Sequence, residues 1–311
     1  TPGGLKLFAL FLCWLVARIA YFFGDTYVAV AAIFDGAFTL ALIFSIGAPI
    51  VAARQWPQLA IVSKVVLLGV GNALFYAGVL GVLDQGARWG VYMGLYLVIG
   101  LILTMGRRVI PAFIERGVGY SVVLTNRRWV DLSSMILFVG FFILDTFTQY
   151  KNIAGALAAV LFLLHCVRAA GWHTRGIWRK PLLWSLFCAY LFIVSGFGLY
   201  ALSIFTSFAS YVLAIHAFAV GGIGLITISM MARVALGHTG RDVHAAPNEL
   251  NWVFALIALT FVVRVLFPMA DAQHYLLWLT LSALTWILGF ALFLIVYVPI
   301  LSRRRVDNRP G

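Results

Sequence analysis

Ten long apolar segments follow one another along this chain of 311 residues, and they limit it to one class of fold. Each has about the 20 residues that an α-helix needs to cross a bilayer. Their approximate limits are 5–23, 27–52, 58–83, 89–113, 130–147, 151–169, 181–203, 207–232, 249–267 and 273–301. No segment alternates apolar and polar residues with a period of two, which excludes a membrane β-barrel. The sequence therefore predicts an all-α, polytopic transmembrane bundle of about ten helices, forming a single integral membrane domain over residues 1–311.

The charged residues, only 10% of the chain, are distributed unevenly between the turns. The net charge of +12 would suit a nucleic-acid partner, but the basic residues gather in the turns after the even-numbered segments. These are Arg54, Arg107, Arg108, Arg116, Arg127, Arg128, Arg175, Arg179, Lys180, Arg233, Arg241, Arg303, Arg304, Arg305 and Arg309. This is the positive-inside bias, so we expect both termini in the cytoplasm, the lipid bilayer as partner and no nucleic acid.

The first three apolar segments contain the polar residues Arg18, Asp35 and Asn72. Arg18 is late in the first, outward-running segment and Asp35 is early in the second, so both fall at similar depth in the outer half of the membrane. Opposite charges at one depth on adjacent helices predict a structural ion pair, with a proton path as the alternative. Asn72, in the third segment, is expected to form a hydrogen bond with a neighbouring helix.

Six histidines raise the question of metal binding: His165, His173, His216, His238, His244 and His274. A histidine inside hydrocarbon needs a partner and marks a functional site by default. His216 and His238 are 22 residues apart, about 33 Å along a helix, so they cannot hold the same ion. His165 is predicted to lie about one helical turn deeper than His216. That offset is too large for one small ion, although a tilted pair could flank a planar macrocycle.

The segment from His216 to Arg241 contains the strongest candidate site. Small residues on the side adjoining His216, Gly221 and Gly224 among them, leave room either for a flat ligand or for a closely packed helix. Imidazole suits iron and copper alike, and a structural hydrogen bond is the alternative role of His216. His173, His238 and His244 follow in cytoplasmic turns and could form a second, exposed metal site.

The turn GRRVIPAF closes the fourth segment, where Pro111 is expected to distort the last helical turn. Its Arg107 and Arg108 either anchor the chain to anionic lipid head groups or clamp an anionic group such as a haem propionate. No phosphate-binding loop, dinucleotide fingerprint or zinc-protease motif occurs, so hydrolase and nucleotide-driven functions have no support.

Several motifs together resemble the NnrS family of membrane proteins. They are HAFAVGGIGLITISMMARVALGHTGR, GRRVIPAF, RQWPQLAIVSKVVLLGVGNALFYA, DGAF and PLLWSLFCAYLFI, spread over most of the chain. The resemblance implies haem, copper and a link to nitric oxide and nitrosative stress, in the cytoplasmic membrane of a bacterium. Family members typically have twelve helices, so it also implies that the first two precede Thr1.

Two functional hypotheses follow. In the first, a haem/copper protein binds or helps to remove nitric oxide or iron-nitrosyl species. His216 would hold the haem iron with His165 as a further metal candidate, Gly221 and Gly224 would admit the ring, and Arg107, Arg108 or Arg233 would meet the propionates. His238, with His173 or His244, would bind copper. Turnover stays open, and the sequence identifies neither an electron donor nor an oligomeric state.

The second hypothesis is a transporter without a redox cofactor. It is supported by the glycine-interrupted helices and by the intramembrane Arg18, Asp35 and Asn72.

Overall fold

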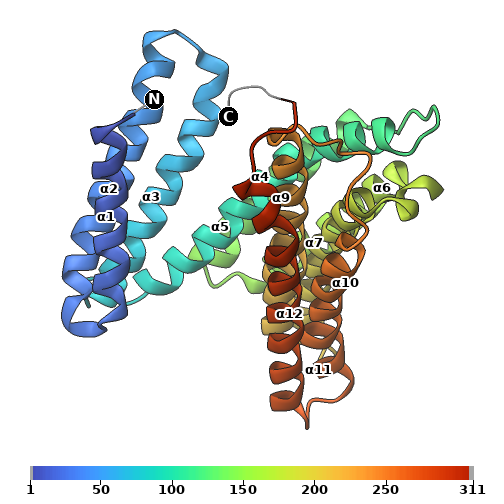
Figure 1. Cartoon of the computed structure of the whole chain (residues 1–311). Coiled ribbons are helices and arrows are strands. Elements are labelled where there is room, and N and C mark those ends of the chain that lie inside the picture. The colour runs from blue at the N-terminus through green and yellow to red at the C-terminus, as the bar shows by residue number, and fades with distance from the viewer. Residues whose placement is uncertain (1–2, 308–311) are drawn as a thin grey trace. The chain divides into compact units, whose positions relative to one another are not determined.

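The structure, a computed structural model that describes residues 3–307, is helical, and no strand forms in that range (Figure 1). Ten helical spans within it are long and apolar enough to cross a membrane, which confirms the predicted all-α bundle. The regular helices are α1 Leu5–Phe22, α2 Val28–Ala52, α3 Leu59–Val79, α4 Gly86–Gly117, α5 Arg128–Phe147, α6 Lys151–Trp172, α7 Pro181–Phe205, α8 Tyr211–His216, α9 Leu225–His238, α10 Leu250–Phe261, α11 Phe267–Ala270 and α12 Tyr275–Ser302. Short helical segments are η1 Asp25–Tyr27, η2 Trp56–Gln58, η3 Arg175–Arg179, η4 Ala217–Gly224 and η5 Val262–Leu266.

The chain forms two compact units, Thr1–Leu101 and Ile102–Gly311, and the boundary between them falls inside α4. The first unit contains α1 to α3 and the first part of α4. The second contains the rest of α4 and all later helices.

A polar cluster holds the first three helices of the first unit together. Arg18 on α1 and Asp35 on α2 form the predicted ion pair, with 2.6 Å between Nη2 and Oδ2. The amide of Asn72 on α3 donates to the same Asp35 oxygen at 3.2 Å, and the Tyr76 hydroxyl donates to it at 3.1 Å. Both sequence predictions for this region, the ion pair and the interhelical hydrogen bond of Asn72, are therefore confirmed.

Helix α7 is the central element of the second unit. It contacts α6, α8, α9, α10 and η4, and about two thirds of its membrane-spanning window is buried. Aromatic rings fill the contacts: Phe197 lies 4.9 Å from Phe218 and Tyr200 lies 4.8 Å from Phe141, measured between ring centroids. A Cβ atom at Gly196 would come within 2.6 Å of the Phe218 ring, so the close approach of α7 and η4 requires a glycine there.

The helices differ from the predicted segments in two local details. Helix α4 continues four residues beyond the predicted end at residue 113 and passes through Pro111 to Gly117. Proline has no backbone N–H, so one carbonyl of the helix loses its hydrogen-bond donor. In a membrane bundle, neighbouring helices and local adjustments of the backbone can satisfy that carbonyl, so the helix continues. The predicted regular helix over 207–232 is also interrupted, since residues 217–224 form a π-helix. A second π-helix occupies residues 262–266.

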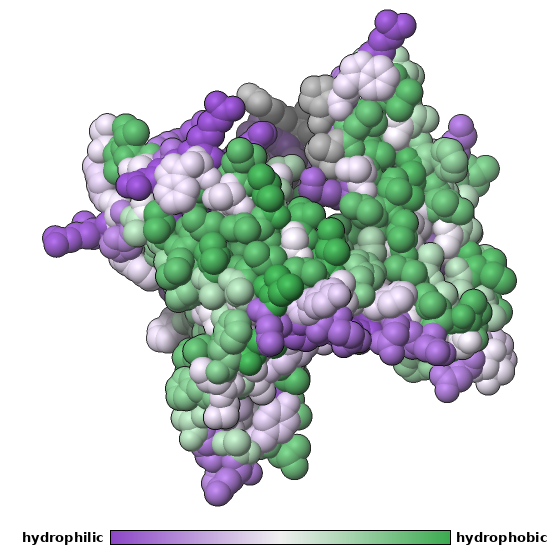
Figure 2. Space-filling view, turned by 180° about the vertical axis from the view of Figure 1, so that it is seen from behind, coloured by the Kyte–Doolittle hydropathy of each residue, from purple (hydrophilic) through white to green (hydrophobic). Residues whose placement is uncertain are grey.

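The helices expose a large hydrophobic surface, as Figure 2 shows for one face of the molecule. On α12, for example, Leu276 is 74% exposed and Ile295 is 70% exposed. A soluble protein does not present so much contiguous apolar surface to water. The exposed leucines and isoleucines are therefore the surface that contacts lipid, and this is a multi-pass membrane protein.

Asp145, at the end of α5, is a buried carboxylate that joins four helices. Its side chain is fully buried and accepts hydrogen bonds from Tyr200 on α7 at 2.6 Å and from Tyr211 on α8 at 2.9 Å. Lys151 at the start of α6 pairs with it at 2.9 Å. One carboxylate thus fixes how the ends of α5, α6, α7 and α8 meet.

Replacing Asp145 by alanine is expected to destabilise the protein. Tyr200 and Tyr211 would lose their acceptor, and a buried hydroxyl without a partner costs about 1–3 kcal/mol. The thermal unfolding midpoint of the purified protein in detergent should fall clearly. The matched control is Asp271→Ala, which removes an exposed carboxylate paired with His274 and should leave the midpoint nearly unchanged. Equal midpoints for the two variants would contradict this role of Asp145.

Candidate functional site

His216 ends α8, and the chain turns directly after it into the π-helix η4. Its Nδ1 atom lies 2.7 Å from the backbone carbonyl oxygen of Val212, and its Nε2 atom lies 2.9 Å from Nη2 of Arg264. A carbonyl oxygen only accepts and a guanidinium only donates. The proton of the neutral ring is therefore on Nδ1, and Nε2 presents its lone pair to Arg264.

Arg264 belongs to the second π-helix, η5, and is the residue that most directly faces His216. Its Nη1 atom donates to the Tyr275 hydroxyl at 3.0 Å, and its guanidinium carbon lies 5.3 Å from the centre of the Tyr275 ring. No carboxylate of residues 3–307 forms an ion pair with it. The charge of Arg264 is therefore held by an imidazole, a phenol and an aromatic face, all neutral.

Two π-helices adjoin this pair. A π-helix holds one more residue per hydrogen-bonded turn than an α-helix, which shifts the side chains that follow, and such segments frequently occur at functional sites. His216 lies immediately before one π-helix and Arg264 lies inside the other. The hydropathy pattern that located the spans does not reveal either segment.

The glycines near His216 are packed against neighbouring side chains. A Cβ atom at Gly221 would collide with the Phe261 ring and lie 2.9 Å from Phe192, and one at Gly224 would lie 2.7 Å from Trp286. Of the two uses that the sequence left open for these glycines, close helix packing is the one found in this structure.

A turn beside this pair contains Asp271 and His274. Nδ1 of His274 lies 2.8 Å from Oδ2 of Asp271. The hydrogen bond from His274 lowers the pKa of the Asp271 carboxyl below its usual value. The side chain of His274 thus faces a carboxylate.

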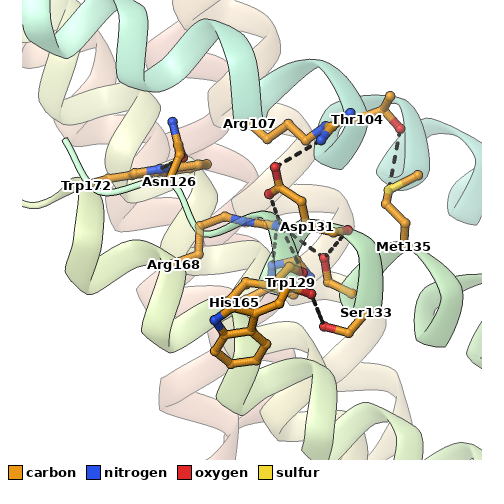
Figure 3. A network of polar contacts seen from close by, with 12 residues as sticks. Thr104, Arg107, Asn126, Trp129, Asp131, Ser133, Met135, His165, Arg168 and Trp172 are labelled. Atoms are coloured by element: carbon orange, nitrogen blue, oxygen red, sulfur yellow. Dashed lines mark hydrogen bonds and ion pairs between the residues drawn. The ribbon is translucent and has the colours of Figure 1, made fainter. Parts of the chain in front are cut away.

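A second polar network of the same unit is drawn in Figure 3. Asp131 on α5 accepts from Arg107 on α4 at 2.9 Å and from Arg168 on α6 at 2.8 Å. Arg168 also donates to the Ser134 hydroxyl at 2.9 Å. A cavity of about 460 Å³ borders Arg168, and Arg127 lines it as well. Three helices are thus joined through one carboxylate and two arginines.

His165 is fully buried at the inner end of this network. Its Nδ1 atom lies 3.0 Å from Nη1 of Arg168 and 2.6 Å from the Tyr190 hydroxyl. Because Arg168 only donates, Nδ1 is an acceptor and the proton of the neutral ring is on Nε2. Within the described part of the chain Nε2 has no hydrogen-bond partner, and the ring stacks on Phe197 with 5.5 Å between centroids. A metal-ligating histidine usually donates its other ring N–H to a carbonyl or carboxylate, and His216 has such an acceptor whereas His165 has none among the described residues.

The other predicted metal ligands are not gathered. Nε2 of His173 accepts from the Trp178 indole at 3.2 Å, His238 is exposed, and the backbone carbonyl of His244 accepts from Lys180. Among residues 3–307, no group of three His, Cys, Asp or Glu side chains could hold a metal ion. The copper role of these histidines stays a prediction.

The three arginines predicted to meet haem propionates lie apart from His216. Arg107 pairs with Asp131, Arg108 is exposed, and the guanidinium of Arg233 lies 3.7 Å over the ring of Phe113. Arg233 is 17 residues beyond His216, about 25 Å along the span. The arginine that His216 contacts is Arg264, which the sequence analysis missed.

A single rule would have found both missed arginines. Arg168 and Arg264 each interrupt an apolar segment, and a charged residue inside a span indicates a functional or paired site. The partners of the two missed residues follow from the helix packing and have no local sequence signal.

The model of the NnrS protein family matches residues 1–305. The chain belongs to the NnrS family. No curated protein and no solved structure matches it. Membership in the NnrS family, together with ten apolar spans, fits a nitric-oxide-related membrane protein.

The Asp131 network of this NnrS protein generates a test by double substitution. Asp131→Asn leaves Arg168 buried without a countercharge, and breaking a buried pair in this way costs about 3–5 kcal/mol. Arg168→Gln removes the buried charge itself. The double variant should therefore lose much less stability than the sum of the losses in the two single variants. Unfolding by denaturant in detergent gives the free energy of unfolding of the parent protein, the two single variants and the double variant. Strictly additive losses would contradict the coupling, and the exposed pair Arg305–Asp307 provides the control cycle.

Proposed function

We propose that this protein binds haem in the membrane through His216 and meets nitric oxide there. One observation carries the proposal, namely the hydrogen bond between Nδ1 of His216 and the Val212 carbonyl. Histidines that ligate metals usually donate their other ring N–H to a carbonyl or carboxylate, which fixes the tautomer and raises the basicity of the ligating nitrogen. His216 has this arrangement inside a membrane-spanning segment.

His216 offers one atom that could bind the iron of haem. The residues around it leave no preformed space for the haem ring. Nε2 of His216 is the correct donor atom, but Arg264 already donates to it. Phe261 and Trp286 fill the space beside Gly221 and Gly224. Haem binding at Nε2 and the contact between His216 and Arg264 therefore exclude each other, because Nε2 has a single lone pair.

Each residue of the site has a distinct role in this proposal. Haem, when bound, supplies an iron atom to which nitric oxide can bind, and apolar diatomic molecules partition into the bilayer where His216 lies. Val212 holds the imidazole in the required tautomer. Arg264, once released from Nε2, is a cation without a carboxylate partner and can pair with an anionic group of the cofactor.

Copper binding by His238 with His173 or His244 is retained as a separate part of the proposal. The transporter alternative gains no observation in its favour. The polar residues that suggested it form a structural cluster, in which Arg18 and Asn72 both contact Asp35.

Visible spectroscopy tests the haem proposal. The full protein, purified after expression with a haem supply, should give a reduced-minus-oxidised spectrum with haem bands, and His216→Ala should abolish them. Addition of nitric oxide to the reduced protein should shift the main absorption band. Metal analysis should find iron in the parent protein and not in the variant.

The control variant is His173→Ala, an exposed histidine outside the span that should retain the spectrum. Arg264→Gln removes the donor that occupies Nε2 but also the cation that would pair with the cofactor, so it should keep the haem bands and weaken haem binding less than His216→Ala does. Haem bands that persist in His216→Ala, or that disappear only in His165→Ala, would overturn the assignment of His216.

A further inference from the structure

A pocket of about 200 Å³ lies in the second unit, at the ends of the helices opposite His216. It forms where α4 ends at Gly117, where η3 passes into α7, and where the loop over residues 243–248 approaches α9. The side chains that matter for its chemistry are Arg179, Lys180, Arg233 and His244. They come from three separate stretches of the chain, so the fold gathers the positive charge at one point.

This positive charge is not neutralised by the protein. No acidic residue lines the pocket, and among residues 3–307 no carboxylate forms an ion pair with Arg179, Lys180 or Arg233. The contacts of two of the three are neutral: Lys180 donates to the His244 carbonyl at 3.4 Å, and the Arg233 guanidinium lies over the Phe113 ring. Three like charges at one cavity repel each other, and an anion in the cavity would relieve that repulsion.

The start of α7 adds to the same potential. This helix of 25 residues begins at Pro181 with no side-chain hydrogen bond capping it, and Lys180, Pro181 and Leu182 line the pocket. The N-terminal end of a helix has a partial positive charge, which favours an anion. The cavity and its three cations thus coincide with a second source of positive potential.

We infer that this pocket binds a phosphate group. Arginine and lysine together provide several N–H donors around one tetrahedral anion, and a phosphate accepts more of them than a carboxylate does. The phosphate belongs either to an anionic phospholipid head group, since the pocket lies at the ends of membrane-spanning helices, or to a soluble phosphate compound. The site is distinct from His216, which is about 25 Å away along the span.

Two binding assays on the full protein distinguish these sources. The first titrates inorganic phosphate into protein held in phosphatidylcholine nanodiscs and measures heat. The second forms nanodiscs from a mixture of phosphatidylcholine and phosphatidylglycerol and measures enrichment of phosphatidylglycerol around the protein. The pocket variant is Arg179→Gln/Lys180→Gln. The matched control is Arg303→Gln/Arg304→Gln, which removes two neighbouring exposed charges outside the pocket.

We expect the pocket variant to lose binding by at least about tenfold in one of the assays, because each hydrogen bond from a charged donor contributes that much or more. The control should bind like the parent protein. Loss in the phosphate titration identifies a soluble ligand, and loss of phosphatidylglycerol enrichment identifies a lipid. Arg179→Gln alone, at an exposed position, repeats the test if the double variant is unstable. Equal binding by pocket and control variants, or no binding of either probe to the parent, would overturn the inference.

Discussion

The need to pair charges inside the membrane is the constraint on which the second unit depends. The hydrocarbon region offers no water to a carboxylate or a guanidinium, so each must find its partner on a neighbouring helix. Asp131 accepts from arginines on two other helices, and Asp145 accepts from Tyr200 and Tyr211. Apolar side chains specify helix register weakly in lipid, because lipid tails are as apolar as leucine. The two carboxylates therefore fix the register of α4 to α8.

Much of the architecture could be predicted because it follows from two properties that can be read locally. Segment length and hydropathy gave the ten spans, since the thickness of a bilayer fixes the length of an apolar helix. Depth arithmetic gave the ion pair between Arg18 and Asp35, because adjacent antiparallel helices place residues equally far from their shared turn at one depth. Neither argument needs to know which face of a helix meets which neighbour.

The candidate site could not be predicted in the same way, because it depends on faces and on irregular backbone. His216 and Arg264 are 48 residues apart and meet where two π-helices interrupt the regular spans. Hydropathy is insensitive to one extra residue in a turn. The glycines beside His216 could equally admit a ligand or a neighbouring helix, and only the positions of Phe261 and Trp286 separate these two uses.

The contact between His216 and Arg264 differs from those of the two arginines in the Asp131 network. Arg107 and Arg168 share a carboxylate, whereas the partners of Arg264 are neutral. An arginine whose partners are an imidazole and a phenol has no countercharge. The free energy cost of removing it from water is therefore only partly offset. A ligand that combines a metal with carboxylates satisfies both groups, since the metal takes Nε2 and a carboxylate takes the guanidinium. The least compensated charge within this span therefore lies next to the imidazole best prepared to bind a metal.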